Sequence, residues 1–343
     1  MDYKSTGVDI DAGNEVVSRI RELARSTFTP DVLSDIGSFG GLFRLNLSAV
    51  TEPVLVSSAD GVGTKLKVAF LAGRHGTIGV DLVNHCVNDI LVQGANPLFF
   101  MDYLATGHLS PAVTAEVVEG LARACSDNGC ALLGGETAEM PGFYADGEYD
   151  LAGFVVGLVD RARLVDGRRI EPGDSLIGLR SSGLHTNGYS LARHVVFDIL
   201  GLRVDATVEG LDGSVADVLL RPHRSYLRLL GPVLADTDGL IKGLAHITGG
   251  GLTDNVPRVL PAGMAVEIDR AAWTPPPIFR FLQDRGGLTD SEVFRTFNMG
   301  IGMVVVCGPS ETTGLLSRFE QEGEHGAVVI GGVTSGDGEV SYI

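Results

Sequence analysis

The sequence predicts a protein of two domains, each with mixed α and β structure. The chain has 343 residues, which is enough for about two domains of ordinary size. Segments typical of strands and of helices alternate from end to end, as in mixed α/β folds. A charged segment at 160–173 ends in Glu171-Pro172-Gly173 and is the best place for a boundary. We therefore expect an N-terminal domain over 1–165 and a C-terminal domain over 166–343.

Local patterns define the elements of the N-terminal domain. Residues 1–13 predict a mobile arm, and apolar residues at helical spacing predict a helix over Asn14–Arg25. Ser110-Pro111 combines a helix cap with proline at the first helical position, which predicts a helix to about Asp127. The other predicted elements are strands at Val54–Ser58, Leu98–Ala105, Ala131–Leu133 and Leu151–Val159 and a helix at Thr77–Gln93.

The C-terminal domain is predicted in the same way. Glycine-rich loops separate its strands from its helices, and apolar runs of four to seven residues mark the strands. The predicted strands are Ser175–Leu179, 264–268, 301–306 and 328–333. The predicted helices are 188–200, 222–235, one that starts at Thr248-Gly249-Gly250-Gly251 and runs to Leu260, 277–284 and 311–322.

Composition narrows the class of function. The net charge of -17 argues against a nucleic-acid or anionic-membrane surface, where a basic stripe is expected. The N-terminus has no apolar signal segment, and no apolar run is long enough to span a membrane. The four cysteines show no C-x-x-C spacing, which is typical of reduced thiols. We expect a cytoplasmic protein, and one of this charge can bind phosphates only locally, through glycine amides, metal ions and a few cations.

The segment from Asp89 to Pro97 is the most informative in the chain. An acid stands at the end of an apolar helix and is followed by Gly94-Ala95 and then Pro97. Glycine and proline stop the helix, so the carboxylate is left beside a sharp turn. An acid fixed beside a turn suits the binding of a metal ion, and ordinary core packing does not need one there.

Glycine-rich loops at 60–65, 134–141, 181–188 and 248–251 are candidates for binding phosphate. Glycine lets backbone amides approach an anion, and helix N-termini favour negative charge. A tight turn needs the same glycines, so one such loop alone would be weak support. The chain has no Gly-Lys dipeptide and no G-x-G-x-x-G after a strand, which argues against a P-loop and a dinucleotide fold.

Three carboxylates suggest how a nucleotide could be held. Asp60, Asp89 and Glu136 each lie beside glycine at the end of a predicted element. Magnesium prefers hard oxygen ligands, usually one or two carboxylates with phosphates and waters. We predict that these acids hold one or more magnesium ions against a triphosphate, with Lys65 touching a phosphate as a point charge. Each acid alone could equally be a helix cap or a solvated turn residue.

Two histidines receive different interpretations. Asp81, His85 and Asp89 share one helix face, but two acids and one imidazole at this spacing do not make a transition-metal site. We therefore expect His85 to be a partly buried, hydrogen-bonded histidine. His185 lies in a glycine-flanked loop before a helix, two residues from Asn187, and could orient or deprotonate a substrate. The alternative for His185 is a loop residue that caps the helix.

Six segments together resemble one family over essentially the whole chain. The pattern D-x4-G-A-x-P at Asp89 is similar to a wider ATP-binding superfamily. The segments E-T-A-E-M-P and H-x-N-G-Y-S resemble those of phosphoribosylformylglycinamidine cyclo-ligases, also called aminoimidazole ribonucleotide synthetases. The segments that carry the resemblance, in order, are Gly7–Gly13, Asp60–Lys65, Asp89–Pro97, Gly134–Pro141, Ser181–Ser190 and Thr248–Gly251.

The resemblance implies a reaction and a set of residues. ATP and formylglycinamidine ribonucleotide would give aminoimidazole ribonucleotide, ADP and phosphate in purine synthesis. It places Asp60, Asp89 and Glu136 on magnesium-ATP, and Asp89 is also a catalytic candidate. The phosphates would meet Lys65 and the preceding loop, Gly61, Gly63 and Thr64. The substrate would meet His185 and Asn187, which are catalytic candidates, and a loop formed by Thr248, Gly249 and Gly250.

The resemblance also implies quaternary structure. The family is a homodimer whose N-terminal sheets join into a barrel, with the nucleotide close to the subunit boundary and the N-terminal arm closing over the site. Arg21 stands where the family pattern leads us to expect lysine, so we give Arg21 no catalytic role. His85 is not part of the family pattern. A requirement for K⁺ in addition to Mg²⁺ stays open.

Two other interpretations remain. The chain could be another phosphotransferase of the superfamily, similar to selenophosphate synthetase or thiamine monophosphate kinase. The first of these would need a reactive cysteine in a glycine-rich N-terminal segment, and none of the four cysteines lies there. The chain could also be a non-catalytic nucleotide-binding subunit, although the full set of acids, Lys65 and His185 argues against that.

Overall fold

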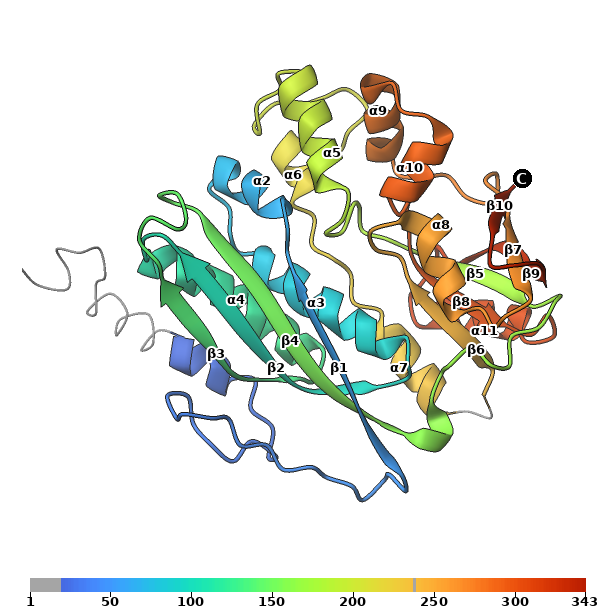
Figure 1. The fold of residues 1–343 in the computed structure, drawn as a ribbon, viewed down its shortest axis with the longest axis horizontal. Coiled ribbons are helices and arrows are strands. Elements are labelled where there is room, and N and C mark those ends of the chain that lie inside the picture. The colour runs from blue at the N-terminus through green and yellow to red at the C-terminus, as the bar shows by residue number, and fades with distance from the viewer. Residues whose placement is uncertain (1–19, 237–238) are drawn as a thin grey trace, which may run out of the picture. The chain divides into compact units, whose positions relative to one another are not determined.

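The structure is a computed structural model that describes residues 20–236 and 239–343. The chain forms two compact units (Figure 1). Unit 1 comprises the described residues up to Ile90 together with Ala95–Arg161, and unit 2 comprises Leu91–Gly94 and Ala162–Ile343. The predicted arm at 1–13 lies outside the described residues. Among the described helices, none combines the length and the apolar character that a membrane span requires.

Unit 1 is built on one four-stranded sheet with the strand order β1-β4-β2-β3. β1 and β2 each pair antiparallel with β4, whereas β2 and β3 run parallel. The strands are β1 (Pro53–Gly61), β2 (Asn96–Thr106), β3 (Ala131–Glu139) and β4 (Tyr149–Asp160), and the helices are α2 (Lys65–Ala72), α3 (Ile78–Leu91) and α4 (Pro111–Asp127). Residues 20–25, the described end of the first predicted helix, are helical.

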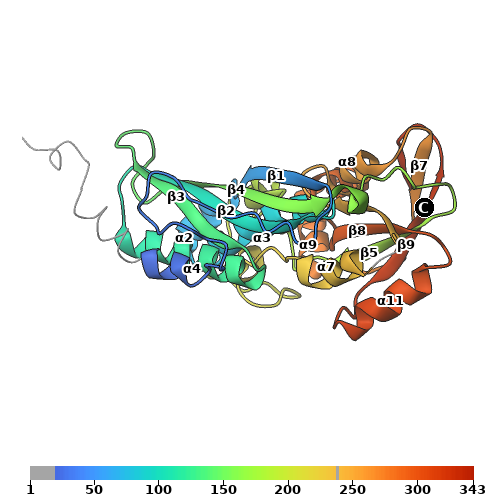
Figure 2. The same ribbon diagram turned by 90° about the horizontal axis from the view of Figure 1, so that it is seen from below.

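Helix α3 packs directly on the inner face of this sheet, and α4 covers the same face (Figure 2). Two glycines of β4 make the contact possible. A Cβ atom on Gly153 would lie 2.9 Å from Leu82 Cγ, and one on Gly157 would lie 2.6 Å from Ile90 Cδ1. Both side chains are completely buried. The absence of side chains on β4 therefore lets α3 lie close to the sheet.

The outer face of the same sheet carries apolar side chains that stay exposed. Met101 pairs with Phe154 across β2 and β4, and directly paired residues point to one face of a sheet. By the same alternation, Leu55 and Tyr103 lie on that face. Leu55 is 58% exposed and Phe154 48%. Contiguous exposed apolar side chains of this kind are typical of an interaction surface.

The main departure from the predicted elements concerns β3. The strand predicted for Ala131–Leu133 continues to Glu139, so the segment 134–139 is a strand and not a loop. It pairs residue by residue with β2 as far as Glu139, which satisfies its backbone groups despite the two glycines. Lys65 likewise does not lie in a loop, because it is the first residue of α2.

Unit 2 is built on a six-stranded sheet with the order β10-β7-β9-β5-β8-β6. All neighbouring strands are antiparallel except β10 and β7, which run parallel. The interior strand β8, between β5 and β6, is buried along its whole length, so the core of the unit lies around it. The strands are β5 (Ser175–Arg180), β6 (Ile241–His246), β7 (Met264–Ile268), β8 (Ile301–Cys307), β9 (Val328–Ser335) and β10 (Val340–Tyr342).

Two predicted helices of unit 2 change helix type along their length, and α9 extends two residues beyond its predicted end. The helix predicted for 188–200 is an α-helix of five residues, α5, followed by a π-helical segment, His194–Ile199. The one predicted to run to Leu260 stops at Asn255 and continues as a 3₁₀ segment, Val256–Val259. The α-helices are α5 (Tyr189–Arg193), α6 (Val215–Leu219), α7 (Leu227–Ala235), α8 (Gly251–Asn255), α9 (Pro277–Gly286), α10 (Asp290–Thr296) and α11 (Thr312–Gln321).

Asp102 on β2 gives unit 1 a testable dependence on pH. Burial raises the pKa of this carboxyl to about 7, and nearby Glu136 adds to the effect. Because the folded state holds the proton more tightly than the unfolded chain, Asp102 makes stability fall as pH rises from about 4 to about 7. Asp102→Asn should therefore raise the free energy of unfolding at pH 8, with the gain vanishing below pH 4. Urea denaturation across this range tests it, and a gain independent of pH would contradict it.

Candidate functional site

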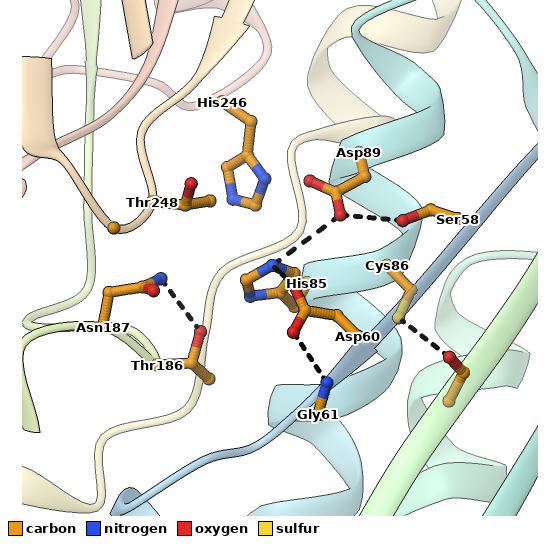
Figure 3. Close-up of polar contacts among 12 residues, drawn as sticks. Ser58, Asp60, Gly61, His85, Cys86, Asp89, Thr186, Asn187, His246 and Thr248 are labelled. Atoms are coloured by element: carbon orange, nitrogen blue, oxygen red, sulfur yellow. Dashed lines mark hydrogen bonds and ion pairs between the residues drawn. The ribbon is translucent and has the colours of Figure 1, made fainter. Parts of the chain in front are cut away.

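Unit 1 brings two of the predicted metal-binding acids together around one histidine. His85 Nε2 lies 2.8 Å from Asp60 Oδ2 and 3.7 Å from Asp89 Oδ2 (Figure 3). Ser58 Oγ donates a hydrogen bond of 2.9 Å to the same oxygen of Asp89. Asp60 and Ser58 come from β1, and His85 and Asp89 from one face of α3. Strand and helix thus hold two carboxylates beside each other.

The electrostatics of this cluster follow from its burial. The His85 side chain is 4% exposed, whereas the Asp60 side chain is 46% exposed. Burial alone would lower the pKa of His85, but the hydrogen bond to Asp60 and the charges of Asp89, Asp60 and Asp81 outweigh it and raise the pKa. His85 is hydrogen-bonded, as predicted, and it is buried more deeply than the partly buried state that the sequence predicted. Its partners are the two acids that the sequence singled out.

The loop that follows Asp60 is open to solvent at its end. Gly63 and Thr64 are exposed, and Gly63 has a φ of +67°, a conformation that glycine adopts without strain. They directly precede the first turn of α2, where backbone amides can receive an anion. The amide of Gly61 itself donates to Asp60 Oδ1 at 2.7 Å.

Lys65 does not present its ammonium group to this loop. Its side chain is fully buried, and Nζ lies 2.8 Å from Asp81 Oδ1, which is also fully buried. Burial lowers the pKa of Lys65, and the neighbouring carboxylate opposes that effect. The structure thus gives Lys65 a partner on α3 inside unit 1, in place of the phosphate contact that the sequence predicted.

Glu136 is the predicted acid that unit 1 keeps apart from the other two. It lies on the edge strand β3, whereas Asp60 lies on β1 at the opposite edge, three strand spacings or roughly 14 Å away. Glu136 pairs with Tyr103 and so points to the exposed outer face, whereas the α3 side holds Asp60. Within unit 1, Glu136 therefore does not join the cluster of Asp60 and Asp89, and the prediction that all three acids hold one or more magnesium ions stays a prediction.

In unit 2, the predicted substrate residue His185 occupies a strained and enclosed position. Its φ is +63°, which is uncommon outside glycine, and its side chain is 1% exposed. Nε2 accepts a hydrogen bond of 3.2 Å from the backbone N–H of Ser182. A Cβ on Gly302 of β8 would lie 2.5 Å from His185 Cε1, so glycine is required where the ring crosses the strand.

The other predicted substrate residues of unit 2 lie together. Asn187 Oδ1 would be 3.3 Å from a Cβ on Gly249, so the amide rests against the glycine loop. Asn255 Nδ2 donates to the carbonyls of Gly249 at 3.1 Å and Gly251 at 2.8 Å, which fixes the loop that starts at Thr248. Gly250, with a φ of +99°, provides the turn into α8.

Two histidines that sequence analysis did not single out join His185. The His223 ring stacks on the His185 ring with centroids 3.9 Å apart, and His223 Nε2 lies 3.1 Å from His246 Nε2. His246 is the last residue of β6, two positions before Thr248, so its place at a strand end beside a glycine loop could have marked it. Nothing in the local sequence around His223 distinguishes it.

Comparison with protein families covers both units. The N-terminal domain of AIR synthase related proteins matches residues 45–159, and their C-terminal domain matches residues 171–343. The two-domain mixed α/β fold and these matches define an AIR synthase-like protein.

Curated relatives narrow the class further. Phosphoribosylformylglycinamidine cyclo-ligases are similar over nearly the full length of both chains. The one from Geotalea uraniireducens (strain Rf4) is 55% identical over 95% of this chain and 93% of its own. The one from Geobacter metallireducens is 56% identical, over 96% and 94%, and that from Myxococcus xanthus 53%, over 99% and 98%. The chain therefore belongs to the family of phosphoribosylformylglycinamidine cyclo-ligases.

Solved structures at lower identity share the fold. Thiamine-monophosphate kinase from Stenotrophomonas maltophilia K279a aligns with a TM-score of 0.66 at 18% identity, covering 96% of this chain and 95% of that one. Hydrogenase maturation protein HypE in complex with ATP aligns with a TM-score of 0.66 at 20% identity, covering 96% and 90%. At these identities the likeness extends to the fold alone.

The Lys65–Asp81 pair yields a prediction about stability. Asp81→Asn leaves a buried ammonium without its counter-charge, so we expect the free energy of unfolding to fall by about 3–5 kcal/mol. The double variant Lys65→Met/Asp81→Leu should recover most of that loss, because apolar side chains of similar size can replace a buried ion pair. Urea denaturation measures both. A loss below about 1 kcal/mol in Asp81→Asn, or loss of ATP binding by a stable double variant, would contradict a structural role.

Proposed function

We propose that this enzyme uses ATP to close the imidazole ring of aminoimidazole ribonucleotide from formylglycinamidine ribonucleotide, releasing ADP and phosphate, in purine synthesis. Membership of the cyclo-ligase family, at 53–56% identity over almost the whole chain, is the observation that carries the proposal. The clusters around His85 in unit 1 and around His185 in unit 2 supply residues of the kinds that the reaction needs.

The chemistry explains why ATP is required. A formamide oxygen is a poor leaving group, so it does not depart directly as hydroxide or water when the amidine nitrogen attacks the formyl carbon. Phosphorylation of that oxygen gives an iminophosphate, and the neighbouring amidine nitrogen attacks its carbon to form the C–N bond of the ring. Phosphate departs and the nitrogen loses a proton. The enzyme contributes mainly position and charge neutralisation in the first step.

Asp60 and Asp89 fit a magnesium ion on the nucleotide. Their carboxylate oxygens contact one imidazole nitrogen, they are partly exposed, and hard oxygen ligands are what Mg²⁺ prefers. Bound there, the ion would neutralise charge on the phosphates. Gly63 and Thr64, exposed at the start of α2, are the proposed backbone contacts to phosphate. Asp89 is held by the hydrogen bond from Ser58, and Asp60 by hydrogen bonds from His85 and the Gly61 amide.

The residues proposed to bind the substrate lie in unit 2. His185 is the residue proposed to orient the amidine or to accept its proton, and the strained φ of +63° fits a functional position. Asn187 lies against the loop of Thr248, Gly249 and Gly250, whose backbone is proposed to hold the ribose phosphate. These roles rest on the family resemblance and on the grouping of the residues within the unit.

The proposed enzyme is a homodimer joined through the N-terminal sheets. The exposed outer face of β1, β2 and β4, which carries Leu55, Met101 and Phe154, supports this because a second copy would bury it. Glu136 belongs to the same face. In such a dimer Glu136 would lie at the subunit boundary, where it could still serve nucleotide binding although it is distant from Asp60 of its own chain.

The reaction itself is tested by substrate dependence. ADP release should require formylglycinamidine ribonucleotide and should not respond to selenide or thiamine phosphate, the acceptors expected for the alternative superfamily activities. Asp89→Asn should lower kcat/KM for ATP by about a hundredfold or more, because one carboxylate that neutralises phosphate charge is lost.

Asp127→Asn is the matched control for Asp89→Asn. Asp127 is an exposed acid at the end of α4 in the same unit, and its replacement changes the net charge equally. It should retain wild-type kinetics. Tight ATP binding without turnover in the wild type would instead favour a non-catalytic nucleotide-binding subunit.

The dimer is tested by placing charge on the outer face. Phe154→Asp should convert the protein from a dimer to a monomer, because burying an unpaired carboxylate in an apolar interface costs several kcal/mol. Light scattering coupled to size exclusion measures the mass. Leu71→Asp, which also charges an exposed apolar residue of unit 1 but on α2, should remain dimeric. A monomeric wild type at micromolar concentration would contradict the proposal.

A further inference from the structure

Three buried histidines meet inside unit 2. His185 comes from the loop after β5, His223 from the segment before α7, and His246 from the end of β6. Their exposed fractions are 1%, 1% and 6%. Buried histidines usually pair with a carboxylate or a backbone group, whereas here two of the imidazoles bond to each other.

His223 occupies the centre of the group. One face of its ring stacks on His185, with an angle of 23° between the ring planes. Its Nε2 atom is 3.1 Å from His246 Nε2, and its Nδ1 atom is 3.3 Å from Thr186 Oγ1. Thr186 in turn accepts from Asn187 Nδ2 at 3.4 Å (Figure 3). His223 therefore contacts His185, His246 and Thr186.

The bond between two Nε2 atoms imposes a condition on their protons. One nitrogen must carry the hydrogen and the other must offer its lone pair. Two neutral imidazoles can satisfy this only as opposite tautomers, one protonated at Nε2 and the other at Nδ1. The tautomer of His246 is therefore set by that of His223, and a proton added at one end of the pair changes the other end.

A metal ion shared by the three histidines would explain their arrangement less well than the ring stacking and the hydrogen bond do. The three ring nitrogens are close enough for an ion to be considered. A metal binds imidazole along the nitrogen lone pair, in the plane of the ring, and the rings of His185 and His223 stack with 23° between their planes, which disfavours in-plane binding of one ion by both. His185 Nε2 is also already hydrogen-bonded to the Ser182 N–H.

We propose that His223 is a positioning residue for ring closure, which holds the imidazole of His185 by stacking and fixes the tautomer of His246 by their hydrogen bond. It touches neither ATP nor the substrate and acts through its two neighbours. The inference deepens the proposed function and rests on it for any effect on turnover. The tautomer relation rests on the structure alone.

The proposal is tested by nitrogen-15 NMR spectra of the histidines and by steady-state enzyme kinetics. Nitrogen-15 labelling of the eight histidines, with the resonances assigned by single replacements, reports which ring nitrogen of each carries a proton. At pH 8 the wild type should show His223 and His246 as opposite tautomers. His223→Phe, which retains an aromatic ring on His185 but removes both nitrogens, should change the nitrogen shifts of His246. His223→Gln offers a second replacement if the phenylalanine variant does not fold.

The kinetic prediction separates positioning from folding. His223→Phe should lower kcat at least about tenfold while KM for both substrates stays within about twofold, because a misplaced proton-transfer group slows chemistry more than binding. His194→Phe, the same change at an exposed histidine of unit 2, should leave both constants unchanged.

Three results would overturn the inference. One is identical tautomers for His223 and His246 in the wild type. The second is a kcat within twofold of wild type in a folded His223→Phe variant. The third is stoichiometric Zn²⁺ binding that disappears in that variant, since this would make the group a metal site. Absence of turnover in the wild type would instead refute the proposed function, and the tautomer measurement would still decide whether His223 fixes the tautomer of His246.

Discussion

The close packing of α3 on β4 is the contact on which the N-terminal site depends. Gly153 and Gly157 leave room for Leu82 and Ile90, so the helix lies directly on the sheet. His85 and Asp89 lie on the side of α3 that faces the sheet. His85 there contacts Asp60 of β1, and Asp89 accepts a hydrogen bond from Ser58 of β1. A side chain at either glycine would lift the helix and separate the two acids. Two glycines of β4, one of which pairs directly with Asp60 across the strands, thus set the geometry of the carboxylates.

Helix α3 also shows why two acids on the same helix can have different roles. Asp81 lies two turns before Asp89 and faces the interior, where it neutralises the fully buried Lys65. Asp89 lies near the end of the helix and remains partly exposed. Burial separates the structural acid from the acid available to a ligand. In unit 2, Gly302 has a role like that of the β4 glycines, because it lets the His185 ring cross β8.

Much of the fold could be predicted because the patterns were long and periodic. The helix at 77–93 and the strand at 151–159 are found within about two residues of their predicted ends. The strand at 131–139 was underestimated, since Gly134 and Gly135 suggest a loop and only pairing with β2 makes them a strand. The role of Lys65 depends on Asp81, which lies sixteen residues away in sequence, and no local pattern reveals that partnership.

His185 and Asn187 stand in one motif, so the sequence already shows that they are near each other along the chain, and their roles stay predictions. The meeting of His85 with Asp60, and of His223 with His185, comes from packing between separate segments, so only the structure reveals it. The same applies to the exposed apolar face of unit 1. Its residues alternate with buried ones along each strand, and which side is buried depends on where α3 lies.

The central claim is that the acids held together by α3 and β1 bind the metal ion of the nucleotide. A crystal structure with Mg²⁺ and a non-hydrolysable ATP analogue tests it most directly. The account predicts oxygens of Asp60 and Asp89 within about 2.1 Å of magnesium, with Glu136 of the same chain away from that ion. A magnesium ion held by neither Asp60 nor Asp89 would contradict it.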